Sequence, residues 1–112
     1  MARYALSVVV IAILISAPLA AETWKNVPIV DAMCLSKVKD DPDAHTKSCL
    51  MSCAASGFGI LTSEGDYLKF DEEGNQKAQA ALKQTDKKDH LRVTVEGDRE
   101  GDNLKVKTIS MD

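Results

Sequence analysis

The chain has 112 residues, of which 45% are hydrophobic and 28% are charged, and its formal net charge is −3. A chain of this length builds one small domain, which excludes two domains, a polytopic membrane protein and a large enzyme with its own cofactor domain. The acidic balance also argues against nucleic acid as a partner and against attraction to anionic lipid, because both need an excess of lysine and arginine.

The first 21 residues predict an export signal. Arg3 supplies a positive charge, residues 6–15 are almost uninterrupted hydrophobe, and the small residues of Ser16–Ala21 follow, as a signal peptidase requires. We therefore expect a signal peptide at residues 1–21, one domain at residues 22–112, a periplasmic or secreted location, and no membrane association after cleavage. An uncleaved anchor is the alternative, because the stretch from Tyr4 to Ala21 has no charge and is just long enough to span a bilayer.

The next segment predicts a strand followed by a helix. Val27–Cys34 alternates as a strand does, with Val30, Ala32 and Cys34 on one face. The acidic, proline-containing segment Asp41–Asp43 predicts the start of a helix. That helix is expected to end near Ser56, because Gly57 is a natural residue after a helix C-terminus.

The remaining segments predict four strands and a second helix. Phe58–Thr62 and Tyr67–Phe70 are expected to form a hairpin. Asn75 is expected to cap a helix that ends near Gln84 and buries Ala78, Ala81 and Leu82. The last two strands are expected at His90–Glu96 and Leu104–Met111, separated by a polar turn over Gly97–Asn103. In the first of these strands, the residues expected to face inward are Leu91, Val93 and Val95.

The expected order of elements is β-α-β-β-α-β-β, a mostly β fold with two helices. Five strands with a helix between the third and the fourth are the arrangement of the OB fold. The sequence therefore predicts an OB-like five-stranded barrel. The first helix is then an insertion between the first and second strands.

The residues that could bind a metal ion are concentrated on this inserted helix. His45, Cys49 and Cys53 are spaced i, i+4, i+8, which places them in a stripe roughly 80° wide on one helix face. Cys34 is the only other cysteine. Cys34, His45, Cys49 and Cys53 together predict a Cys₃His metal site, and such thiolate and imidazole ligands suit copper or zinc.

A disulfide is the main alternative for these cysteines, because exported proteins are commonly oxidised. Three cysteines leave at least one thiol over in the monomer. Helix positions four apart have Cβ atoms about 5–6 Å apart, whereas a disulfide needs roughly 3.5–4.5 Å. A bridge would therefore join Cys34 to Cys49 or to Cys53.

At these residues the chain resembles a family of small exported bacterial proteins. The resemblance rests on D-x-x-C at Asp31 and Cys34, on H-x₃-C-x₃-C at His45, Cys49 and Cys53, and on a G-I-L-T-like strand at Gly59–Thr62. It covers about Val27 to Met111. It implies an OB-like fold and a role for the Cys/His set, but no settled activity.

These features predict a small exported metal-binding protein, not an enzyme, that carries, buffers or senses copper or zinc. Its expected partners are the metal ion and a protein that receives the ion. The alternative is a disulfide-stapled or thiol-redox binding module without metal, in which Cys34 and one helix cysteine exchange electrons.

Overall fold

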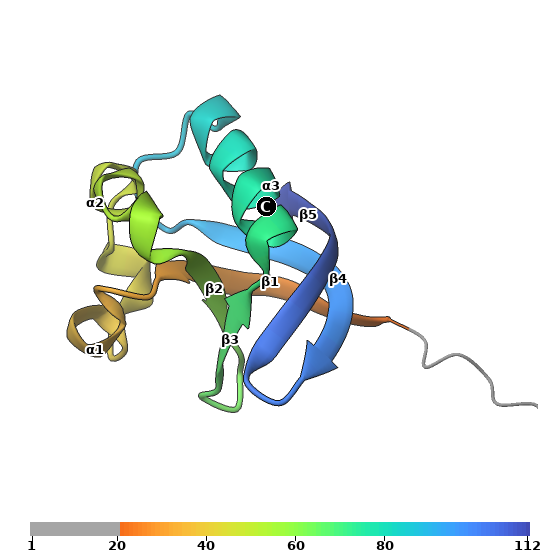
Figure 1. The fold of residues 1–112 in the computed structure, drawn as a ribbon. Helices are drawn as coiled ribbons and strands as arrows, with labels where there is room; N and C mark the ends of the chain where they lie inside the picture. Colours follow the sequence, from red (N-terminus) through yellow and green to blue (C-terminus); the bar gives the residue numbers. More distant parts are fainter. Residues whose placement is uncertain (1–20) are drawn as a thin grey trace, which may run out of the picture.

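The computed structural model describes residues 21–112, which form five strands, three α-helices and two short 3₁₀ helices (Figure 1). In chain order these are β1 (Glu22–Asp31), α1 (Leu35–Val38), η1 (Pro42–Ala44), α2 (Lys47–Ser52), η2 (Ala54–Ser56), β2 (Phe58–Leu61), β3 (Tyr67–Phe70), α3 (Glu72–Gln84), β4 (Arg92–Glu100) and β5 (Asn103–Met111). No helix within this part of the chain is long and apolar enough to span a membrane. Apart from Ala21, the expected signal peptide lies outside the described residues.

The five strands close into a barrel in the order β1-β2-β3-β5-β4. Every neighbouring pair is antiparallel except β3 and β5, which are parallel. α3 connects β3 to β4, while α1 and α2 lie together on one side of the barrel, between β1 and β2 (Figure 1). The predicted OB-like five-stranded barrel is confirmed, with three α-helices in residues 21–112 where two were expected.

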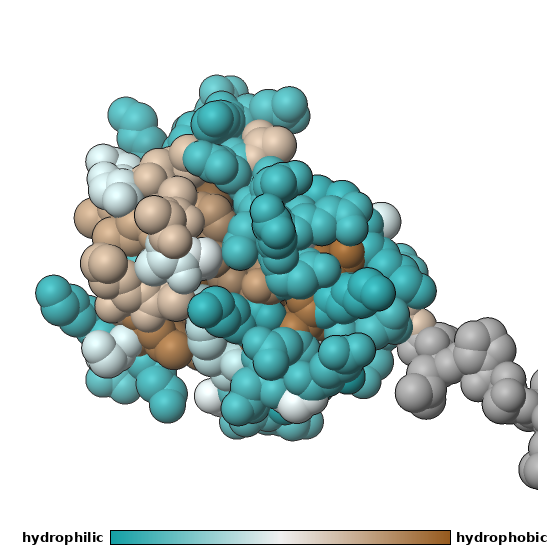
Figure 2. Space-filling view, in the orientation of Figure 1, coloured by the Kyte–Doolittle hydropathy of each residue, from teal (hydrophilic) through white to brown (hydrophobic). Residues whose placement is uncertain are grey.

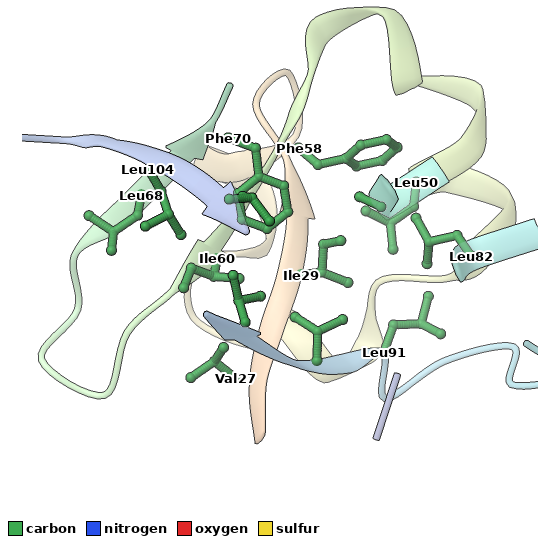
Figure 3. Packing of buried hydrophobic residues seen from close by; sticks show 14 residues of the cluster. Val27, Ile29, Leu50, Phe58, Ile60, Leu68, Phe70, Leu82, Leu91 and Leu104 are labelled. Carbon is green, nitrogen blue, oxygen red and sulfur yellow. The ribbon is translucent and has the colours of Figure 1, made fainter. Parts of the chain in front are cut away.

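Apolar side chains from all five strands and from α2 and α3 fill the barrel (Figure 3). The predicted inward residues around β4 are buried: Leu91 is 2% exposed, and Val93 and Val95 are 0% exposed. Their neighbours Arg92, Thr94 and Glu96 are half-buried or exposed. The period of two along this strand therefore separates core from solvent as the sequence predicts.

Truncating Val93 tests this core assignment. We expect Val93→Ala to lower the free energy of unfolding by about 1–3 kcal/mol, because two buried methyl groups are lost and a cavity remains. Glu96→Ala, on the exposed face of the same strand, should change it by less than about 0.5 kcal/mol. Denaturant unfolding measures both, and equal effects would contradict the assignment.

The first strand differs from its expected range of Val27–Cys34. It starts at Glu22 and ends at Asp31. Trp24 pairs with Val95 of β4, and a β-bulge between Trp24 and Val27 shifts the register of this pairing. The residues of this half-strand are mostly polar, and Asn26 has a left-handed backbone (φ 51°), so the half-strand lacks the alternation that is typical of a strand. Cys34 lies beyond the strand, at the N-cap of α1.

The N-cap of α3 lies four residues before the expected cap at Asn75. Asp71 is the N-cap, and its Oδ1 accepts a hydrogen bond from the Gly74 amide at 2.9 Å. The Asn75 side chain instead accepts a hydrogen bond from the Phe58 amide at 2.8 Å. Ala78 and Leu82 are buried as predicted, whereas Ala81 is only half-buried.

The hairpin of β4 and β5 is longer than predicted. Both strands run through the expected turn of Gly97–Asn103 and leave only Gly101 and Asp102 between them. Gly101 has φ +62°, a left-handed conformation that glycine adopts without steric cost. The polar residues of this segment therefore belong to the end of the β4–β5 hairpin, which pairs with β1 at Gly97 and with β3 at Asn103.

Candidate metal centre

The segment that connects β1 to β2 carries all three cysteines, but it does not form the single helix predicted from Asp41–Asp43 to Ser56. It forms α1, η1, α2 and η2, and α2 spans only Lys47–Ser52. Thr46 has extended backbone (φ −85°, ψ 155°), and its Oγ1 accepts a hydrogen bond from the Cys49 amide. Such side-chain caps compete with helix continuation, which explains why the predicted helix is broken.

Several contacts hold this connecting segment against the barrel. The Ala32 amide donates to the Gly57 carbonyl at 3.0 Å and so closes the base of the segment. The Lys47 amide donates to the Lys88 carbonyl at 2.8 Å. Leu50, the buried residue of α2, enters the core beside Leu82 of α3 (Figure 3).

An ion pair ties the same segment to β4. The Arg92 guanidinium donates two hydrogen bonds to the Asp43 carboxylate, both at 3.0 Å. Because Arg92 donates to it, the pKa of Asp43 is lowered. The His90 amide also donates to the Asp43 carbonyl at 2.9 Å. These bonds fix the backbone of the residues that precede His45.

Three side chains converge at the base of the connecting segment. Asp31, Cys34 and Cys53 each offer one ligand atom, and these atoms all lie within 4.8 Å of one another. The Sγ atoms of Cys34 and Cys53 are 3.8 Å apart. Asp31 is fully buried, and the two cysteines are half-buried free thiols. This group, called the Asp31–Cys34–Cys53 centre below, could hold a metal ion.

Asp31 organises the centre through both of its carboxylate oxygens. Oδ2 accepts a hydrogen bond from the Cys34 amide at 2.9 Å, which fixes the turn that carries the thiol. Oδ1 lies 2.7 Å from His45 Nε2. Asp31 and His45 are the buried polar residues among residues 21–112, so each satisfies the other. A carboxylate bonded in this way accepts the imidazole N–H and orients the ring.

The predicted ligands are therefore only partly brought together. Cys34 and Cys53 meet, whereas His45 contacts Asp31 and is not part of the three-residue group. Cys49 is exposed on α2 and also lies outside the group. The expected helix stripe of His45, Cys49 and Cys53 is wrong, because His45 lies before α2 with extended backbone (φ −70°, ψ 124°).

Sequence reasoning missed Asp31 as a site residue. Two signals pointed to it. The D-x-x-C spacing suits a carboxylate that caps a turn three residues on. A carboxylate that directly follows Ile29 and Val30 is also buried with the strand, and a buried carboxylate needs partners.

The surroundings of the centre favour the protonated forms of the Cys34 thiol and the Tyr67 hydroxyl. Partial burial, the hydrogen bond with Cys53 and the charge of Asp31 raise the pKa of Cys34 from 9.0 to about 11. Burial, and then the charge of Asp31, raise the pKa of Tyr67, whose hydroxyl donates to the Val30 carbonyl at 3.0 Å. A cation bound beside Asp31 would reverse this bias by favouring the thiolates.

Thiolate sulfur and carboxylate oxygen are donors that a borderline metal ion accepts together. Four-coordinate zinc, for example, takes cysteine, histidine and carboxylate ligands, and an open position is filled by water or by a further ligand. No family model, curated protein or solved structure matches this chain.

Proposed function

We propose that the chain is an exported protein that binds one copper or zinc ion through Cys34 and Cys53, with Asp31 beside them. It acts as a carrier, buffer or sensor of the ion and not as an enzyme. The hydrophobic segment before residue 22 supports export to the periplasm or the medium.

The distance between the two sulfur atoms carries this proposal. Two thiolates bound to one tetrahedral ion at about 2.3 Å are roughly 3.8 Å apart, and Cys34 Sγ and Cys53 Sγ lie 3.8 Å apart. A disulfide would bring them to about 2.0 Å, and the two cysteines are free. The pair therefore has the spacing of two ligands on one ion.

The surroundings of the centre also suit a soft or borderline ion that is passed to another protein. Met33, directly before Cys34, is 68% exposed, and its thioether is a soft donor. Its backbone is held in place, because the Met33 amide donates to Ser56 Oγ at 3.2 Å. On the face shown in Figure 2, apolar residues gather over α1 and α2, whereas most of the remaining surface is hydrophilic. A partner that receives the ion would dock on this apolar side.

Native mass spectrometry of the full chain tests the proposal. The reduced chain, titrated with Cu(I) or with Zn(II) against a competing chelator, should retain one ion of at least one of these metals. The same spectra, taken after alkylation, should show that bound metal protects two of the three thiols. Retention of neither metal, or binding that leaves all three thiols reactive, would contradict the proposal.

The pH dependence follows from Cys34. Its pKa of about 11 means that the metal-free thiol keeps its proton throughout the neutral range, and metal must displace that proton. The apparent affinity should therefore rise by about tenfold per pH unit from this proton alone, and fall as the pH is lowered. Chelator competition at several pH values between 6 and 8.5 measures the slope. A flat profile would show that Cys34 is not a ligand.

A further inference from the structure

The two sulfur atoms of the Asp31–Cys34–Cys53 centre are also poised to react with each other. They lie 3.8 Å apart, so forming a bond of about 2.0 Å needs each sulfur to move by roughly 0.9 Å. Rotation about the Cα–Cβ bonds supplies a movement of this size. The barrel itself need not change.

The backbone around both cysteines permits this movement. Cys34 lies between β1 and α1 with φ −97° and ψ 2°, and Cys53 lies between α2 and η2 with φ −104° and ψ 16°. Neither residue is inside a strand or a helix. A small shift at either position therefore breaks no sheet ladder and no helix interior.

Cys49 is a poor disulfide partner for Cys53. It is on α2, four residues before Cys53, whose amide donates to the Cys49 carbonyl. This hydrogen bond keeps Cys53, the C-cap of α2, close to its helical position relative to Cys49, and helical positions four apart have Cβ atoms about 5–6 Å apart. That separation exceeds the roughly 3.5–4.5 Å of a disulfide. Joining Cys49 to Cys53 would strain the end of α2.

We propose that Cys34 and Cys53 form a reversible disulfide that switches the metal centre off. The oxidant is a disulfide of a small thiol or of a protein. One cysteine thiolate attacks a sulfur of that disulfide and expels one thiolate, and the second cysteine thiolate then attacks the mixed disulfide and expels the other. Two electrons pass to the oxidant, and the two cysteine protons end on the two released thiols. The oxidised pair has no thiolate left to bind an ion.

The metal half of this inference rests on the proposed function, whereas disulfide formation does not. The metal-free full chain is equilibrated in mixtures of reduced and oxidised glutathione, and the remaining thiols are trapped by alkylation. Intact mass should show two cysteines that carry neither an alkyl group nor glutathione, whereas the exposed Cys49 is alkylated or carries one glutathione. The variants are Cys34→Ser, Cys53→Ser and the control Cys49→Ser.

The Cys49→Ser control is decisive for the location of the bond. Trypsin cleaves after Lys47 and Lys69 but not between them, so one peptide holds both Cys49 and Cys53. Cys49→Ser should form the internal disulfide at the same glutathione ratio as the unsubstituted chain. Cys34→Ser and Cys53→Ser should form no internal disulfide and should take up glutathione instead. The oxidised chain should lose its equivalent of metal, and reduction should restore it.

The possible outcomes separate the two proposals. Loss of the internal disulfide in Cys49→Ser, or its absence at every glutathione ratio, overturns the redox pair and leaves metal binding intact. A disulfide between Cys34 and Cys53 in a chain that never binds metal overturns the proposed function and the switch, and supports the redox pair alone. Full metal retention by the oxidised chain overturns the switch.

Discussion

Replacing Cys53 with serine is expected to abolish metal retention, whereas Cys49→Ser leaves it nearly unchanged. Cys53 Sγ lies 3.8 Å from Cys34 Sγ, and Cys49 is exposed and outside the centre. Loss of a direct ligand should weaken binding by more than about 100-fold, since even outer-sphere partners contribute 10–100-fold. Cys34→Ser should match Cys53→Ser. Chelator competition with Cu(I) and with Zn(II) measures all three variants.

The comparison also tests the ligand set that the sequence predicts. If the ion has four ligands, Cys49→Ser should weaken metal binding as much as Cys53→Ser does. Those four ligands are Cys34, His45, Cys49 and Cys53. An equal loss in both variants would therefore favour that set, and would require the connecting segment to rearrange around the ion. Circular dichroism of each metal-free variant serves as the control for folding.

The second large effect is expected at Leu50, which is 0% exposed and anchors α2 in the core. Leu50→Ala should lower the free energy of unfolding by about 2–5 kcal/mol. It should also weaken metal binding by about tenfold, the lower end of the range for changes outside the ligand shell, because Cys53 directly follows this helix. Denaturant unfolding and chelator competition measure the two effects.

Val93→Ala is the matched control for Leu50→Ala. Val93 is also 0% exposed, but it lies on β4, remote in sequence from the cysteines. It should lower stability without changing the metal affinity of the folded protein. If both variants weaken metal binding equally at a temperature at which both remain folded, then general stability controls affinity and Leu50 has no special part in it.

The barrel was predictable because its strands follow simple patterns. Leu91, Val93 and Val95 alternate with more exposed neighbours, as a half-buried strand requires. The position of the long helix between the third and fourth strands then identified the OB order. The first half of β1 was missed, because Lys25 and Asn26 are exposed and a bulge interrupts the alternation.

The site was predicted less well, because its geometry depends on contacts distant in the chain. The i, i+4 spacing of His45, Cys49 and Cys53 indicated one helix face, but Thr46 caps a new helix and leaves His45 outside it. Cys34 and Cys53, 19 positions apart, meet only because the segment between them folds back on itself. The contact of His45 with Asp31 is likewise a tertiary one, and no local pattern predicts it.

The Asp31–Cys34–Cys53 centre lies at the base of the connecting segment, where β1 ends and β2 begins, and this position affects how the chain folds. The first pairing of β1 with β2 joins Asp31 to Phe58, across 27 positions of chain. A link between Cys34 and Cys53, by an ion or by a disulfide, shortens that separation to about nine positions along the chain. Loop-closure entropy grows with the logarithm of length, so the link makes this pairing about 1 kcal/mol easier to reach. When Cys34 and Cys53 are linked, the pairing of β1 with β2 becomes nearly as local as that of a hairpin. Chains whose contacts are local in sequence fold faster.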